Sequence, residues 1–227
     1  MLTALYRAIA DLGNPALRRI ITMSLSLAVA GFMVLWVGLA ILLGHVTPSG
    51  WRYVDWTVDL LGGLTVLALT WLLFPAVGTL VMGCFLDRIA REVEAADYPL
   101  LPSARPVSVA VTLTAMLRLT AATIILNLLA LPLYLLFPVA NVVIFAALNG
   151  YLLGREYFEV VALRRLEPVS VRRVRHRLAI RWYIGGVVIA GLFAVPVVNL
   201  IAPVVATAFM VHLFEGWRRT VPHLTAF

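Results

Sequence analysis

Four long stretches of the chain contain no acidic or basic residue. They run over residues 20–44, 60–86, 119–154 and 182–214. Each is longer than the roughly 20 apolar residues that a helix needs to cross the hydrocarbon core of a membrane. A segment in lipid must satisfy its own backbone hydrogen bonds, and a helix does so within one segment. The pattern therefore predicts an all-α membrane protein.

The first half of the chain predicts one surface helix and two long spanning helices. In residues 1–17, apolar side chains repeat along one helical stripe, which is typical of a helix lying in the membrane interface. A transmembrane helix is then expected over 18–44. A second is expected over 58–94, extending into the cytoplasm, where Asp87 with Arg91 and Arg88 with Glu92 have the i,i+4 spacing of helical ion pairs.

The second half of the chain predicts two helical hairpins, over 107–165 and 182–217. The arms of the last hairpin have about 14–16 residues, or roughly 21–24 Å at the helical rise. This is short of the roughly 30 Å hydrocarbon core, so the hairpin is expected to penetrate the membrane and turn inside it. The first arm of the other hairpin is long enough to span, and for that hairpin both options remain open.

Proline and asparagine mark the two hairpin turns. Pro138 precedes Asn141 by three residues, and Pro196 precedes Asn199 by the same interval, with Pro203 further on. The prolines are interpreted as helix breakers. The shared spacing favours a weak internal repeat of two hairpins. Each asparagine either caps its turn or lines a polar path through the membrane.

Composition agrees with the membrane prediction and adds a charge pattern. Hydrophobic residues make up 63% of the 227 residues and charged residues 13%, against about 25% charged residues in soluble domains. The net charge of +7 comes from arginine alone. The arginines border the apolar stretches, which favours a membrane protein over a nucleic-acid-binding one. The positive-inside rule then places both termini in the cytoplasm.

A basic amphipathic segment is expected over 169–181. Val171, Val174 and Leu178 share one face of this segment, with arginines around them. Contact with anionic lipid head groups is the simpler explanation. Concentration of an anionic substrate near a pore is the alternative.

Arg18 and Arg19 are the candidate anion-binding residues. They stand at the start of a predicted spanning helix, where free amides and the helix dipole favour an anion. Guanidinium groups also match tetrahedral oxyanions in bidentate geometry. The alternative is an ordinary positive-inside anchor.

Charged residues near the hairpins are further candidates for a transport path. Glu156, Glu159 and Glu215 flank hairpin ends, where they pair with neighbouring arginines or couple transport to protons. Arg118 either marks a pathway or extends its side chain to the lipid head groups. Metal-ligand spacing and catalytic motifs are absent from the sequence, so we expect neither an enzyme nor a cofactor.

Two blocks of sequence resemble the CysZ/etoposide-induced-protein-domain family of membrane proteins. The first is the run Asn-Gly-Tyr-Leu-Leu-Gly-Arg-Glu-Tyr-Phe-Glu at 149–159 with Ala-Leu-Arg-Arg at 162–165. The second is the Pro-Val-Val-Asn-Leu-Ile-Ala-Pro turn at 196–203. The resemblance covers nearly the whole chain.

The resemblance implies a function, a fold and an anion site. Bacterial members are sulfate permeases that supply cysteine synthesis, act as homo-oligomers and have two long spanning helices with two partly penetrating hairpins. The family's sulfate site uses paired arginines, which match Arg18 and Arg19. Asn14-Pro15-Ala16 stands where a glycine is common. The prediction is an inner-membrane permease for sulfate or a similar oxyanion. The alternative is a non-transporting, lipid-interacting scaffold of the same family.

Overall fold

A computed structural model of the chain describes residues 1–44, 63–64, 81–105 and 109–220. Every regular element within these residues is helical, which confirms the predicted all-α class. The chain forms two compact units, one of residues 1–18 with 86–227 and one of residues 19–85. Most of the predicted second span at 58–94 lies outside the described residues.

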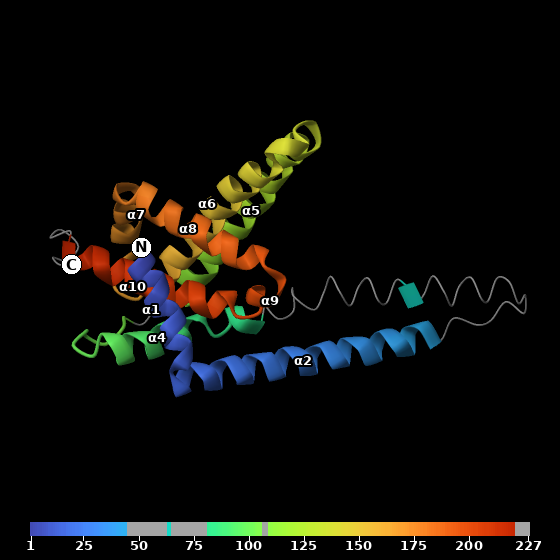
Figure 1. Cartoon of the computed structure of the whole chain (residues 1–227), viewed down its shortest axis with the longest axis horizontal. Coiled ribbons are helices and arrows are strands. Elements are labelled where there is room, and N and C mark those ends of the chain that lie inside the picture. Colours follow the sequence, from blue (N-terminus) through green and yellow to red (C-terminus); the bar gives the residue numbers. More distant parts are fainter. Residues whose placement is uncertain (45–62, 65–80, 106–108, 221–227) are drawn as a thin grey trace, which may run out of the picture. The chain divides into compact units, whose positions relative to one another are not determined.

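Eleven labelled helical elements follow one another along the described residues, besides short helical stretches at 63–64 and 81–83 (Figure 1). In chain order these are α1 (Leu2–Ala10), η1 (Asp11–Gly13), α2 (Pro15–Gly44), α4 (Leu86–Asp97), α5 (Val109–Leu136), η2 (Pro138–Ala140), α6 (Asn141–Ala162), α7 (Pro168–Arg177), α8 (Ala179–Ala194), α9 (Pro196–Asn199) and α10 (Ala202–Thr220).

Helix α2 has the length and composition of a membrane span. The stretch Pro15–Gly38 has 24 residues, or about 36 Å at the helical rise, which exceeds the hydrocarbon core. Within the second unit, the Ser24 hydroxyl donates to the carbonyl of Ile20 and to the sulfur of Met82, both at 2.8 Å. The segment around Met82 therefore lies against α2.

The helix expected to run on into Glu94 is interrupted shortly before α4. Residues 81–83 are helical, 84–85 form a turn and α4 begins at Leu86. Gly83 precedes the turn, and glycine lowers the stability of a helix interior by about 1 kcal/mol. The predicted pair of Asp87 and Arg91 is present at 2.8 Å.

Helices α5 and α6 form the first predicted hairpin (Figure 1). The 28 residues of α5 reach about 42 Å, and its stretch Leu117–Leu136 is a candidate membrane span. Large apolar side chains at this end of the hairpin point outward, and Val139 at the tip is 98% exposed. An exposed apolar surface of this kind is suited to lipid.

The second predicted hairpin consists of α8, α9 and α10. The 16 residues of α8 reach only about 24 Å, as expected for an arm that does not cross the membrane. Every residue of α10 from Ala202 to Glu215 is buried. Helices α1, α4, α6 and α8 all contact α10, which therefore forms the centre of the first unit.

The basic amphipathic segment ends earlier than its sequence pattern indicates. Helix α7 stops at Arg177, and α8 leaves at an angle of 87°. Val171, Val174 and Leu178 are buried, so the predicted apolar face of this segment is confirmed.

The N-terminal helix α1 packs on α10, and its residue Ala8 is buried. Leu2, Tyr6 and Ile9 of its predicted apolar stripe are exposed, whereas Leu5 is half-buried. This exposure leaves the stripe for a membrane interface.

Glycines allow α6 and α8 to cross at close range. Gly150 and Gly154 of α6 have the small-xxx-small spacing of closely packed membrane helices. A Cβ added at Gly186 of α8 would lie 1.9 Å from the carbonyl oxygen of Gly150 and 2.5 Å from the Cα of Gly154. Because backbone atoms cannot move aside as a side chain can, this position accepts glycine alone.

We expect Gly186→Ala to lower the free energy of unfolding of the detergent-solubilised protein by about 2 kcal/mol or more, since overpacking costs of order 1–3 kcal/mol. Gly191→Ala is the matched control, because nothing lies within 4 Å of a Cβ at that position of the same helix. Chemical unfolding in detergent measures both. Equal stabilities of the two variants would show that the close crossing is absent.

Candidate functional site

Arg18 and Arg19 are the fourth and fifth residues of α2, and both are exposed. The backbone around them is largely occupied. Pro15 has no amide hydrogen, the amide of Ala16 donates to Asn14 Oδ1 at 2.9 Å, and the amide of Arg18 donates to the carbonyl of Asn14 at 3.0 Å. An anion at this position would therefore be held mainly by the guanidinium groups, with less help from the helix amides than the sequence predicts.

The two hairpin turns differ in detail despite their shared spacing. Pro138 begins η2 and Asn141 begins α6, whereas Pro196 begins α9 and Asn199 ends it. With its amide oriented so that the nitrogen faces the end of α5, Asn141 donates to the carbonyls of Tyr134 and Phe137, both at 3.1 Å. Asn141 thus satisfies the carbonyls at the end of α5, which is a capping role.

Asn199 is in a different situation from Asn141. Its side-chain oxygen is buried and accepts no hydrogen bond from any residue that the structure describes. An unpaired buried acceptor costs about 1–3 kcal/mol. A polar group kept at such a cost is a candidate for contact with a solute or water. Pro203 lies at the second position of α10, where a missing amide hydrogen removes no helical bond.

The three candidate glutamates are placed unequally. Glu159 accepts from Arg155 Nε at 3.1 Å and pairs with Arg175. Glu215 pairs with Arg218 at 3.1 Å. Glu156 lies partly buried in α6 and forms no ion pair with the described residues.

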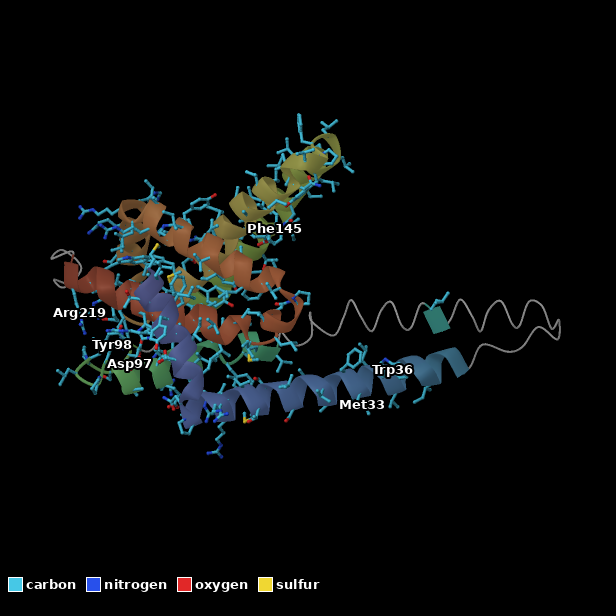
Figure 2. The ribbon with its side chains drawn as sticks, viewed as in Figure 1. Met33, Trp36, Asp97, Tyr98, Phe145 and Arg219 are labelled. Atoms are coloured by element: carbon cyan, nitrogen blue, oxygen red, sulfur yellow. The ribbon has the colours of Figure 1, made fainter. Side chains whose placement is uncertain are left out.

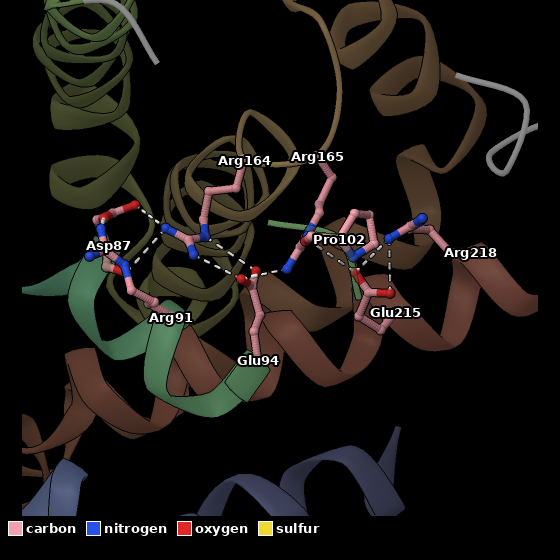
Figure 3. A network of polar contacts seen from close by, with 8 residues as sticks. All are labelled: Asp87, Arg91, Glu94, Pro102, Arg164, Arg165, Glu215 and Arg218. Atoms are coloured by element: carbon pink, nitrogen blue, oxygen red, sulfur yellow. Dashed lines mark hydrogen bonds and ion pairs between the residues drawn. The ribbon is translucent and has the colours of Figure 1, made fainter. Parts of the chain in front are cut away.

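A buried ion-pair network joins α4 to the segment after α6 and to α10 (Figure 3). Arg164 binds Glu94 through two nitrogens, with Nε to Oε1 at 3.2 Å and the second contact to Oε2 at 2.8 Å. Arg164 also pairs with Asp87. Burial by itself lowers the pKa of Arg164, but hydrogen bonding and charge from Glu94, with those of Asp87, raise it overall. The guanidinium therefore stays charged in the interior.

Arg165 extends the network from Glu94 toward α10. Its guanidinium lies 2.5 Å from Glu94 Oε2 and donates to the carbonyl of Pro102 at 2.6 Å. Its Nε is 3.9 Å from Glu215 Oε1, which is an ion-pair distance and too long for a hydrogen bond. Figure 3 shows Glu94 lying between Arg164 and Arg165. Both side chains of the pair Arg165 and Glu94 are more than nine-tenths buried.

Sequence reasoning missed this network, although α4 carries a signal for it. Leu86, Ile89, Ala90 and Val93 form the buried face of α4. Glu94 follows Ala90 by one helical turn and so falls on the same face. A carboxylate on the apolar face of a helix indicates a buried partner, but the periodicity does not identify which arginine supplies it.

A second polar cluster surrounds His212 of α10, and the sequence analysis did not predict it either. The ring atom Nε2 lies 2.9 Å from Asp11 Oδ2 and 3.4 Å from Asp97 Oδ2, while Nδ1 lies 2.9 Å from the Tyr98 hydroxyl. Figure 2 shows Asp97 and Tyr98 beside Arg219, whose guanidinium carbon is 5.5 Å from the centre of the Tyr98 ring. Both ring nitrogens of His212 are used within the cluster, so a metal would have to displace one of these partners.

Asp97 is the electrostatically unfavourable member of this cluster. Burial and the nearby Asp11 carboxylate raise the pKa of Asp97 from its ordinary value of 3.8, and attraction to His212 offsets this only in part. The charged form of Asp97 is therefore less favourable in the folded protein than in the unfolded chain.

The sequence model of one protein family matches most of the chain. The family is described as sulfate transporter CysZ/etoposide-induced protein 2.4, and its model matches residues 4–203. No curated protein and no solved structure matches the chain.

We expect Asp97→Asn to raise the midpoint temperature of unfolding at neutral pH. A carboxyl group whose pKa is raised by folding contributes its stability in full at pH values below its ordinary pKa of 3.8. This stability is lost as the pH rises through the pKa of the folded protein. The gain of the variant should therefore shrink as the pH is lowered toward that range. Thermal unfolding in detergent at a series of pH values measures it. A variant less stable than wild type at neutral pH would show that attraction to His212 prevails.

Proposed function

Because the chain belongs to the sulfate transporter CysZ/etoposide-induced protein 2.4 family, we propose that it is a membrane permease for sulfate or a similar small oxyanion. The family match is the observation that carries this proposal. Two candidate membrane spans and an exposed arginine pair at the start of one of them support it.

In this proposal Arg18 and Arg19 bind the anion at the membrane surface. Both guanidinium groups are exposed, and no described carboxylate forms an ion pair with either of them. A planar guanidinium donates two parallel hydrogen bonds to a tetrahedral oxyanion. The first turn of α2 supplies the positive end of a helix dipole in the same place.

The transport path is proposed to pass the hairpin turns. Asn199, with its unpaired buried oxygen, is the better supported path residue, since it has polar capacity that the fold does not use. Asn141 is occupied by the end of α5. Glu159 and Glu215, held by arginines, would limit the positive charge at the mouth of the path, and Glu156 remains the glutamate open to proton coupling.

The proposed setting is the inner membrane of a bacterium, with both termini in the cytoplasm. The arginine clusters that border the apolar stretches support this orientation. We further propose a homo-oligomer that supplies sulfur assimilation, driven by the gradient of the substrate or of an ion, with neither enzyme activity nor a cofactor.

A scaffold that interacts with lipid is the second candidate function. The exposed apolar stripe of α1 favours it, because such a stripe binds a membrane interface without any need for transport. Such a protein would not require its arginines to bind a soluble anion.

Uptake of radiolabelled sulfate into proteoliposomes separates the two functions. We expect uptake above that of empty vesicles, and a reduction of about tenfold or more in Arg18→Gln/Arg19→Gln, because a hydrogen bond to a charged group contributes roughly 1.5–3 kcal/mol. Arg173→Gln/Arg177→Gln is the matched control, since both residues are exposed on α7. Wild-type uptake equal to that of empty vesicles, with the protein folded and inserted, would contradict the permease and favour the scaffold.

A further inference from the structure

A cavity of about 270 Å³ opens between α5, α6 and α7, within the first unit. Its charged lining consists of four arginines and one glutamate, which are Arg118, Arg155, Glu159, Arg172 and Arg175. Apolar side chains such as Ala115 and Leu163 complete the walls. Pockets for drug-sized ligands have about 300–1,000 Å³, so this cavity is of a size for a small ligand or a head group.

The arginines that line the cavity outnumber the carboxylates that line it. Glu159 is the carboxylate of the lining, and it serves two arginines, Arg155 and Arg175. These three side chains are mostly buried, with exposed fractions between 14% and 19%. Four guanidinium groups against one carboxylate leave a formal charge of 4 − 1 = +3.

Arg118 and Arg172 are the two uncompensated arginines of the cavity. Neither forms an ion pair with the described residues, and both are exposed. They come from different helices, α5 and α7, so they face the cavity from two sides. Guanidinium groups converging from two elements provide the fork-like donors that a tetrahedral oxyanion requires.

The cavity also adjoins the start of a candidate membrane span. Arg118 is the second residue of the candidate span Leu117–Leu136. The adjoining helix α7 is basic, and its apolar residues Val171 and Val174 are buried toward the protein. A cationic cavity beside the start of a span is within reach of a lipid head group and of an ion from the water.

We infer that this cavity is a binding site for a tetrahedral oxyanion, either the phosphate of an anionic lipid head group or a free phosphate or sulfate ion. Arg118 and Arg172 bind the oxyanion directly. Arg155 and Arg175, which pair with Glu159, also line the cavity and add positive charge. The site is separate from Arg18 and Arg19, and it does not depend on whether the protein transports anything.

The test uses the purified full-length protein and two probes. Native mass spectrometry measures retention of phosphatidylglycerol against phosphatidylcholine, and equilibrium dialysis measures binding of radiolabelled phosphate and sulfate. We expect Arg118→Gln/Arg172→Gln to weaken binding of at least one probe by roughly tenfold or more. Arg173→Gln/Arg177→Gln removes two other exposed arginines of α7. It should leave binding of the dialysed ions unchanged and lower phosphatidylglycerol retention less than Arg118→Gln/Arg172→Gln does, because neither residue lines the cavity.

The two binding measurements identify the source of the oxyanion. Loss restricted to phosphatidylglycerol assigns the cavity to a lipid head group, and loss restricted to the dialysed ions assigns it to a free oxyanion. The dialysis is repeated in an Arg18→Gln/Arg19→Gln background, so that binding at α2 does not conceal the result. Failure of wild type to bind either probe, or equal binding by both double variants, would overturn the inference.

Glu159→Gln provides a test that a folding defect cannot imitate. Removal of this carboxylate raises the formal charge of the lining and releases Arg155 and Arg175 for the ligand, so the same probe should bind several-fold more tightly. Unchanged or weaker binding in a folded Glu159→Gln protein would count against the site.

Discussion

The buried carboxylate of Glu94 is the point on which the arrangement of the first unit depends. It lies between Arg164 and Arg165 and thereby fastens α4 to the segment that follows α6, while Arg165 approaches Glu215 of α10. Removing one partner of a buried ion pair costs about 3–5 kcal/mol, because the remaining charge is left uncompensated. The network therefore holds these helices in one arrangement even if its net contribution to stability is small. The close glycine crossing of α6 and α8 then places α8 against the same assembly.

The arginines of the protein fall into two groups, those paired with a carboxylate and those without such a partner among the described residues. Arg164 and Arg165 are buried and share the carboxylate of Glu94, so they belong to the framework. Arg118 and Arg172 face a cavity without carboxylate partners among the described residues, and Arg18 is exposed at the start of α2. In a protein whose excess charge is entirely arginine, uncompensated guanidinium groups are the chemically available positions for an anion. The distribution of carboxylates, more than that of arginines, thus determines where an anion can bind.

Much of the fold could be predicted from the sequence because lipid imposes simple rules. Charge-free stretches and turn prolines predict the hairpins and the short arm α8. The buried face of α7 follows from the positions of Val171 and Val174. The Glu94 network and the His212 cluster could not be predicted, since they join residues that are far apart in the chain and periodicity does not specify partners. The capping bond of Asn141 and the unpaired oxygen of Asn199 likewise depend on turn geometry that the shared Pro-x-x-Asn spacing does not distinguish.

The most direct test of the framework role of Glu94 is a double-mutant cycle between Glu94→Gln and Arg164→Met, with the free energy of unfolding measured in detergent. The account predicts that either single change costs about 3–5 kcal/mol. The double variant should lose clearly less than the sum, because the attraction between Glu94 and Arg164 is lost only once in it. Arg165 loses its Glu94 partner in Glu94→Gln and in the double variant alike. Single changes that each cost below about 1 kcal/mol, with strictly additive effects in the double variant, would show a surface-like pair and contradict the account.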